Sequence, residues 1–328
     1  MGDVADLFDI LILIPVFNDW EAVAQLLAKL DRALIEVDGR LGVLLVDDGS
    51  TTSLPVEFCT KAFQRIDQIQ VLELRRNLGH QRAIAVGLCF TAAKIPCAAV
   101  VIMDGDGEDA PEDVPRLLSE FQARSCQSVV FAERTRRSES RVFTFFYHLY
   151  RLVHFLLTGI KVRVGNFSVI PCSLLSRLVV VSDLWNHYAA SVFKARLPHV
   201  SIPTQRATRL GGKSSMNFAA LVMHGLSAIS VFGDRVGVRM LIVCAILGVI
   251  IVSILAAIVV IQLATALPIP GWVIYASGLL LVILIQLFSS LLFFTLVILA
   301  GRESSSFLPA RDYEFFVSRV REVFPRDE

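Results

Sequence analysis

Residues 98–112 read Ala-Ala-Val-Val-Ile-Met-Asp-Gly-Asp-Gly-Glu-Asp-Ala-Pro-Glu, a short apolar run followed at once by an acidic turn. The apolar part, 98–103, predicts a buried strand. Four of the six residues at 104–109 are acidic, and their mutual repulsion is costly unless a cation compensates it. Hard cations such as Mg²⁺ and Mn²⁺ prefer oxygen ligands. The turn therefore predicts a divalent metal site; a solvated acidic turn leading into a helix at Pro111 is the alternative.

Similar strands recur on either side of this one and alternate with helical patterns. The expected strands are 10–15, 42–46, 70–74, 98–103 and 128–132, and the expected helices are 20–37, 56–66 and 80–94. This alternation predicts an α/β fold with a mostly parallel sheet. Ligands of such sheets bind beyond the carboxyl ends of the strands. Polar clusters fall at those ends: Asn18 and Asp19, residues 47–50, and residues 104–109.

A long uncharged block follows the α/β part. Hydrophobic residues make up 55% and charged residues 19% of the 328 residues, against roughly 45–50% and about 25% in ordinary soluble domains. No Asp, Glu, Lys or Arg occurs between Met240 and Gly301. Prolines near residue 270 divide the block into 240–263 and 272–300, each longer than the roughly 20 residues that cross a bilayer. Two transmembrane helices are predicted, because a soluble hairpin this apolar would lack protein to cover it.

Positive charge flanks both predicted spans. Arg235 and Arg239 precede the first, Arg302 and Arg311 follow the second, and the loop between them is uncharged. The positive-inside rule then places both flanks in the cytosol. The protein is expected to be a multi-pass protein of the inner (plasma) membrane with its α/β domain in the cytosol. The N-terminus has no basic region before an apolar core, so no secretory signal is expected there.

The expected organisation has four parts. Residues 1–217 form the α/β domain, which includes an aromatic-rich segment at 142–157 expected to lie at the membrane surface. Residues 218–239 form an amphipathic interface helix, residues 240–300 the two spans, and residues 301–328 a cytosolic tail. An ordinary core helix is the alternative for both surface segments.

Two classes of function are excluded by composition. The six cysteines occur singly, with no Cys-x-x-Cys pair that would indicate zinc or redox work, and they fit a reducing cytosol. A net charge of +1 gives no support to nucleic-acid binding.

Five blocks of sequence occur in an order typical of one family. They are Ile14-Pro-Val-Phe-Asn-Asp19, Val46-Asp-Asp-Gly-Ser50, Arg76-Asn-Leu-Gly-His-Gln81, Met103-Asp-Gly-Asp-Gly-Glu-Asp-Ala-Pro-Glu112 and Arg209-x-x-Gly212-x-Ser214. Each block alone is a weak signal. Together with the two spans, they resemble the polyprenyl-phosphate glycosyltransferases of glycosyltransferase family 2, which have a GT-A fold and include dolichol-phosphate mannose synthases and bactoprenol glucosyltransferases.

The resemblance implies inverting transfer of a sugar from a nucleotide-sugar to undecaprenyl or dolichyl phosphate, with Mg²⁺ or Mn²⁺ as cofactor. Its implied partners are the donor, the acceptor and membrane lipid; a homo-oligomer is left open. The implied donor-site residues are Pro15, Phe17, Asp19, Asp47, Asp48, Asp104 and Gly105. The implied metal ligands are Asp106 and Glu108, the implied catalytic residues are Asp106, Arg134 and Arg209, and the implied phosphate or acceptor residues are Arg141, Lys213 and Ser214. His80 is expected to hold a loop rather than to act as a base.

Several residues depart from the family pattern. Asp19 replaces a usual Glu, and Glu108 replaces a usual Gln, which predicts a tighter metal site. Gly165-Asn-Phe-Ser168 stands where Gly-Asp-Phe-Arg is usual, and Ser214-Ser-Met216 stands where Ser-Lys-Tyr is usual, with Lys213 as the displaced cation. These changes keep two alternatives open: a membrane glycosyltransferase with a polysaccharide or diacyl-lipid acceptor, and a non-catalytic scaffold in a glycan-assembly complex.

Overall fold

The computed structural model describes residues 8–55, 63–134, 151–160, 164–211, 218–265, 270–303 and 307–324. The chain divides into two compact units. The first contains residues 1–146, 162–231 and 306–328, and the second contains residues 147–161 and 232–305.

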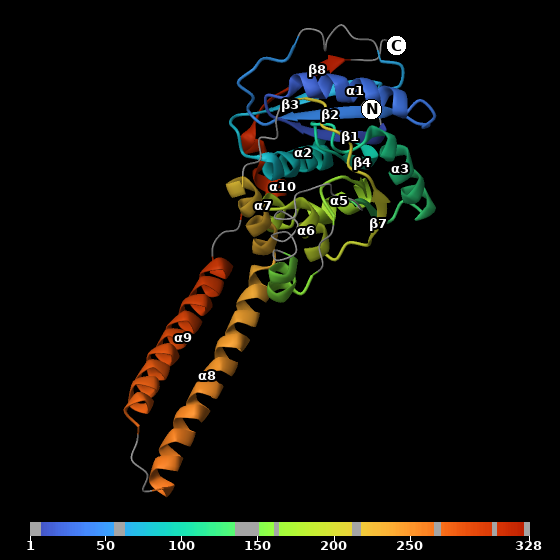
Figure 1. The fold of residues 1–328 in the computed structure, drawn as a ribbon. Helices are drawn as coiled ribbons and strands as arrows, with labels where there is room; N and C mark the ends of the chain where they lie inside the picture. Colours follow the sequence, from blue (N-terminus) through green and yellow to red (C-terminus); the bar gives the residue numbers. More distant parts are fainter. Residues whose placement is uncertain are drawn as a thin grey trace. The chain divides into compact units, whose positions relative to one another are not determined.

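The first unit is built on an eight-stranded sheet with the order β7-β5-β6-β4-β1-β2-β3-β8 (Figure 1). The strands are β1 Phe8–Val16, β2 Leu41–Asp47, β3 Gln68–Leu74, β4 Cys97–Ile102, β5 Val129–Arg134, β6 Ser168–Pro171, β7 His199–Thr204 and β8 Val317–Phe324. Strand β1 pairs in parallel with β2 and β4, and β2 pairs in parallel with β3. Strands β6 and β8 are antiparallel to their neighbours. The predicted α/β fold with a mostly parallel sheet is confirmed.

Helices cover both faces of this sheet (Figure 1). Because successive side chains of a strand point to opposite faces, Leu11 and Leu13 of β1 join one buried cluster and Ile12 and Ile14 join the other. The first cluster includes side chains of α2 (His80–Lys94), α5 (Cys172–Leu178) and α6 (Tyr188–Lys194). The second includes side chains of α1 (Trp20–Ala33) and α3 (Val114–Ala123).

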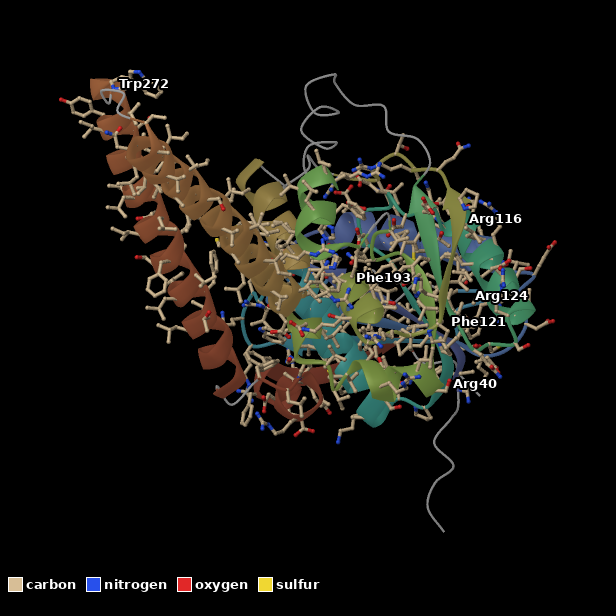
Figure 2. The ribbon with its side chains drawn as sticks, turned by 90° about the horizontal axis from the view of Figure 1, so that it is seen from below. Arg40, Arg116, Phe121, Arg124, Phe193 and Trp272 are labelled. Carbon is tan, nitrogen blue, oxygen red and sulfur yellow. A yellow bond between two sulfur atoms is a disulfide. The ribbon has the colours of Figure 1, made fainter. Side chains whose placement is uncertain are left out.

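Helix α3 illustrates how the sequence sets these faces. Figure 2 labels three of its side chains: Phe121 is 5% exposed, whereas Arg116 and Arg124 lie at the surface. Val114, Leu117 and Leu118 share the buried face with Phe121, a spacing of three and four residues that gives one apolar stripe.

The C-terminal segment completes the sheet. Strand β8 pairs with β3, and Arg319 and Arg321 bind the Glu73 carboxylate at 2.6 and 2.5 Å. Just before β8, Phe307 and Phe316 stack against Trp185, with ring centroids 4.2 and 4.9 Å away. Residues 317–324 of the segment expected as a cytosolic tail, 301–328, thus form an edge strand of the sheet. Only Val323 of β8 is buried, so no buried apolar run marks this strand in the sequence.

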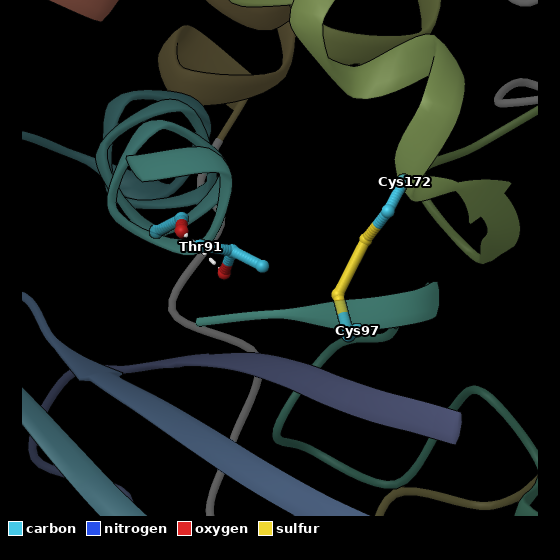
Figure 3. The surroundings of a disulfide bond; sticks show 4 residues. Thr91, Cys97 and Cys172 are labelled. Carbon is cyan, nitrogen blue, oxygen red and sulfur yellow. Dashed lines mark hydrogen bonds between the residues drawn. A yellow bond between two sulfur atoms is a disulfide. The ribbon is translucent and has the colours of Figure 1, made fainter. Parts of the chain in front are cut away.

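A disulfide joins Cys97, at the start of β4, to Cys172, at the start of α5 (Figure 3). The two residues are 75 positions apart, and their Cα atoms are separated by 6.3 Å. No spacing rule pairs cysteines so distant in the chain, and the sequence suggested six reduced thiols. In a reducing compartment the two thiols would face each other at the same place as a dithiol.

The second unit contains two long apolar helices, α8 (Gly233–Ala264) and α9 (Gly271–Glu303). By length and composition both could cross a membrane, with mean hydropathies of 3.2 and 2.6. The interface helix expected at 218–239 is divided, because α7 (Phe218–Ser230) ends before α8 begins. Of the surface segment expected at 142–157, residues 151–157 are described and are helical. Arg239 of α8 donates to the carbonyls of Phe155 and Leu156 at 3.1 and 2.6 Å.

Candidate active site

The loops after β1 and β2 are tied together at the carboxyl edge of the sheet. The side-chain oxygen of Asn18 accepts hydrogen bonds from the backbone N–H groups of Thr51 at 2.8 Å and Thr52 at 3.1 Å. The backbone N–H of Asn18 donates to Ser50 Oγ at 2.9 Å. Asn18 has a φ of 56°, a left-handed conformation that asparagine tolerates better than most residues. The sequence placed Asn18 in a polar cluster at the end of a strand but did not predict this supporting role, although Asn18 lies in the first of the five sequence blocks.

Asp48 is the first residue of the loop after β2. Its side chain is buried, and its two oxygens accept the backbone N–H groups of Leu78 at 2.7 Å and Gly79 at 2.9 Å. Burial raises the pKa of Asp48, although those two hydrogen bonds oppose the rise. Asp48 therefore anchors the loop before α2, and its implied part in donor binding remains a prediction. Phe17 is 47% exposed and Asp47 is partly exposed, so both can face a ligand.

The acidic turn after β4 is compact and internally bonded. Asp106 Oδ1 accepts the Glu108 N–H at 2.9 Å, and the Asp104 N–H donates to Asp109 at 3.0 Å. Gly105 sits against β1, where a Cβ atom would lie 3.1 Å from the Pro15 carbonyl oxygen. The pKa of Asp106 is raised, first by burial and also by the neighbouring carboxylates of Asp104 and Glu108.

Arg209 joins two of the predicted site residues. Its Nη1 donates to Asp106 at 2.9 Å and its Nη2 donates to Asp19 at 3.1 Å, while Nε donates to the Gly211 carbonyl at 2.8 Å. The guanidinium is 23% exposed. The structure thus brings together the residue implied for phosphate, one implied for the nucleotide and one implied for the metal. A metal could take the place of Arg209 beside Asp106, and a diphosphate could take the place of the two carboxylates as the partner of Arg209.

A second hydrogen-bond network connects His80 to residues 165–168, where the sequence departs from the family pattern. His80 Nε2 lies 3.1 Å from Asp104 and 3.0 Å from the Asn166 side-chain nitrogen. Gln81 donates to Asn166 at 3.0 Å and accepts the Tyr188 N–H at 2.8 Å. Burial would lower the His80 pKa, but the carboxylates, Asp104 foremost, outweigh it and the pKa is raised. Asn166 is thus part of a hydrogen-bonded network with His80 and Gln81.

Ser168 also has a structural partner. Its hydroxyl contacts the Tyr188 hydroxyl at 2.9 Å and donates to the Asn166 carbonyl at 2.8 Å. Tyr188 and Ser168 are both fully buried. Asn166 and Ser168, the two residues of this segment that differ from the family pattern, are therefore hydrogen-bonded to each other. This weakens the hypothesis that the protein is a non-catalytic scaffold with a degenerate site.

The carboxylate oxygens of the acidic turn suit a metal ion that binds together with a phosphate-bearing substrate. Among the described residues no group of three or more His, Cys, Asp or Glu side chains is arranged to hold an ion. Mg²⁺ commonly uses one or two carboxylates plus substrate phosphates rather than a protein cage. Asp106, whose carboxylate is largely buried beside other carboxylates, fits that mode of binding. Arg206 binds the Glu108 carboxylate as Arg209 binds that of Asp106, and the role of Glu108 as a metal ligand remains a prediction.

Four of the predicted residues cannot be placed in this geometry. The backbone of Arg134 ends β5, but its side chain lies outside the description. Arg141, Lys213 and Ser214 fall outside the described residues. Their roles remain predictions.

Comparison with known proteins now fixes the family. The model of "Glycosyl transferase family 2" matches residues 11–180, which include β1 to β6 and the whole acidic turn. The chain belongs to glycosyltransferase family 2. Membership in family 2 confirms the resemblance stated from the sequence blocks, and it agrees with the position of the acidic turn at the carboxyl edge of the sheet.

Two curated relatives in family 2 act on polyprenyl phosphates by name. Dodecaprenyl-phosphate galacturonate synthase of Rhizobium johnstonii is 26% identical over 136 residues, which cover 42% of this chain and 39% of that protein. Undecaprenyl-phosphate 4-deoxy-4-formamido-L-arabinose transferase of Salmonella choleraesuis is 26% identical over 232 residues, covering 68% and 67%. The first alignment thus spans about two fifths of its relative's length.

Solved structures give a weaker likeness. Glucosyl-3-phosphoglycerate synthase from Mycobacterium tuberculosis, in complex with Mn²⁺, UDP-glucose and phosphoglyceric acid, has a TM-score of 0.48 at 16% identity, covering 70% of this chain and 80% of that one. TarS of S. aureus has a TM-score of 0.36 at 15% identity, covering 52% and 49%.

Proposed function

We propose that this family 2 protein transfers a sugar from a nucleotide-sugar to a polyprenyl phosphate at the cytosolic surface of a membrane. The single observation that carries the proposal is the bridge from Arg209 to Asp106 and Asp19 at the carboxyl edge of the sheet. It puts a cation between the carboxylate suited to a metal and the carboxylate suited to the nucleotide. The two curated relatives, whose names specify polyprenyl phosphates, support the acceptor class.

The chain's own residues would divide the work as follows. Phe17, Asp19 and Asp47 hold the nucleotide, and Arg209 releases its two carboxylates to bind the diphosphate as it leaves. A divalent metal on Asp106 would neutralise negative charge that develops on the same diphosphate. Asp48 and Asn18 keep the two loops in place.

The acceptor needs no protein base. The second pKa of a phosphate monoester is near 6, so a lipid phosphate is mostly a dianion at neutral pH and can attack the anomeric carbon itself. Attack opposite the leaving diphosphate inverts the configuration at that carbon. His80 then keeps the role that its bonds suggest, which is to orient Asp104 and Asn166.

The direct test is a donor panel. The purified protein in detergent or nanodiscs is incubated with Mg²⁺ or Mn²⁺, undecaprenyl or dolichyl phosphate, and radiolabelled UDP-, GDP- and dTDP-sugars in separate reactions. We expect one or two donors to label an extractable lipid, with the label lost on mild acid treatment. Label in a diacyl lipid or a polymer would support the other membrane glycosyltransferases, and release of no nucleoside diphosphate from any donor would support the scaffold.

The path of the chain adds a prediction about topology. Strand β8 follows both apolar helices yet lies in one sheet with β1 to β7, so the pair must leave and return on one side of any membrane it crosses. We expect a cysteine placed at Thr265 to react with an impermeant thiol reagent outside intact cells, in a background without Cys59, Cys89, Cys126 and Cys244. A cysteine at Ser305 should react only after permeabilisation. Labelling at Ser305 and not Thr265 would put the sheet outside, away from cytosolic sugar nucleotides.

A further inference from the structure

Glu108 has a counter-ion, Arg206, that its position in the sequence does not suggest. Arg206 Nε donates to Glu108 Oε2 at 2.9 Å, and Arg206 Nη2 binds the same oxygen. The two residues are 98 positions apart. The Glu108 side chain is 17% exposed and that of Arg206 is 38% exposed, so the pair is partly shielded from solvent.

Residues 206–210 lie along the acidic turn and are hydrogen-bonded to its backbone at two positions. The Leu210 N–H donates to the Asp106 carbonyl at 2.9 Å, and the Ala207 N–H donates to the Glu108 carbonyl at 3.0 Å. Between them, Gly107 has a φ of 79°, and a Cβ atom there would collide with the Leu210 side chain. Backbone bonds, packing and an ion pair thus fasten residues 206–210 to residues 106–108.

This arrangement changes what the extra charge at position 108 does. A glutamate added to a turn that already holds three carboxylates would be expected to strengthen metal binding. Here the Arg206 guanidinium lies at hydrogen-bond distance from that carboxylate and offsets its charge, so Glu108 also ties the turn to the segment that carries Arg206. Arg209, three residues along the same segment, is positioned against Asp106 and Asp19 by the same attachment.

We propose that Arg206 and Glu108 are a positioning pair: their ion pair fastens the segment that carries Arg209 over the donor site. The proposal rests on the proposed function for its catalytic consequence. Its structural part, the attachment of 206–210 to the turn, does not. Glu108 then acts on catalysis through the place it gives to Arg209.

The test uses hydrogen–deuterium exchange of the full-length protein in detergent, followed at the amides of Ala207 and Leu210. Removing a partly shielded ion pair weakens the attachment, so we expect R206Q and E108Q each to speed exchange of these two amides by about threefold to tenfold. The charge swap E108R with R206E should restore much of the protection. R124Q, which removes the exposed Arg124–Glu120 pair on α3 at 2.8 Å, is the matched control and should leave both amides unchanged.

A second readout separates this role from metal ligation. In transfer assays, a positioning role predicts that E108Q changes the metal concentration for half-maximal rate by less than about threefold, and that the swap recovers activity lost in either single variant. Unchanged exchange in R206Q would overturn the attachment. A rise of more than about tenfold in the metal requirement of E108Q, not recovered by the swap, would make Glu108 a metal ligand and also overturn the proposal. If the wild type transfers no sugar, the exchange measurement still decides the attachment while the proposed function fails.

Discussion

Asp106→Asn is expected to lower the rate of sugar transfer by more than about 100-fold, the loss typical of removing one electrostatic contact to a transition state. Asp106 is the carboxylate of the turn that is suited to a metal, and it also holds Arg209. Its raised pKa reflects burial among like charges, so replacing it with a neutral isostere relieves repulsion and should not unfold the domain. Initial rates at several metal concentrations test the expected loss of transfer, and the melting temperature tests whether the domain stays folded.

A matched control lies a few residues away. Glu112, on the exposed side of the short 3-10 helix at Pro111–Asp113, is an acidic residue outside the turn, and Glu112→Gln should transfer at near the wild-type rate. Wild-type rates in Asp106→Asn at saturating metal would remove Asp106 from the metal site. A large drop in melting temperature would instead make it a structural residue.

Arg209→Gln is expected to lower kcat/KM for the donor by about 100-fold, since a hydrogen-bonded charge at the leaving group is then lost. Lysine should recover little, because Arg209 uses three nitrogens at once, towards Asp106, Asp19 and the Gly211 carbonyl. A point charge cannot reproduce that fork. Donor titrations of Arg209→Gln and Arg209→Lys, with nucleoside diphosphate release as the readout, give kcat and KM separately.

The control for Arg209 is Arg177, an exposed arginine at the end of α5. Arg177→Gln should leave kcat and KM for the donor unchanged. If Arg209→Lys matched the wild type, the forked geometry would be irrelevant to the reaction. If Arg209→Gln lost affinity for the donor without any loss of kcat, its charge would serve binding alone.

The central strands could be predicted from the sequence because each buries both faces and therefore reads as an apolar run. The expected strand at 98–103 and the observed β4, Cys97–Ile102, differ by one residue at each end, and the helix at 80–94 matches α2. Strands β6 and β8 could not be predicted in this way. Strand β6 lies between β5 and β4 and is buried, but it has only four residues. Strand β8 lies at the edge and buries one of its eight residues, which is too little to leave a pattern.

The site residues also divide into those that could be predicted and those that could not. The acidic turn is contiguous in the sequence, so its suitability for a metal could be predicted without its geometry. The bond between Arg206 and Glu108 joins residues 98 positions apart, and no spacing rule pairs surface charges at that distance. Glu108 was expected to bind the metal, but its arginine partner could not be foreseen. The bonds from both Asp48 oxygens to backbone amides could not be foreseen either. The roles of Glu108 at the metal and of Asp48 at the nucleotide remain predictions.

The pairing of β3 with β8 has a consequence for the order in which the protein is made. The bond from Arg75 to the Val317 carbonyl joins residues 242 positions apart, and both long apolar helices are synthesised between them. During translation, β3 must remain an open edge until the helices have left the ribosome, and an open edge can pair with other chains. Insertion of the helices into a bilayer would thus precede the last step of folding of the sheet. A nascent chain stalled between α9 and β8 should therefore depend on chaperones for solubility even though every strand of the acidic-turn site has already been made.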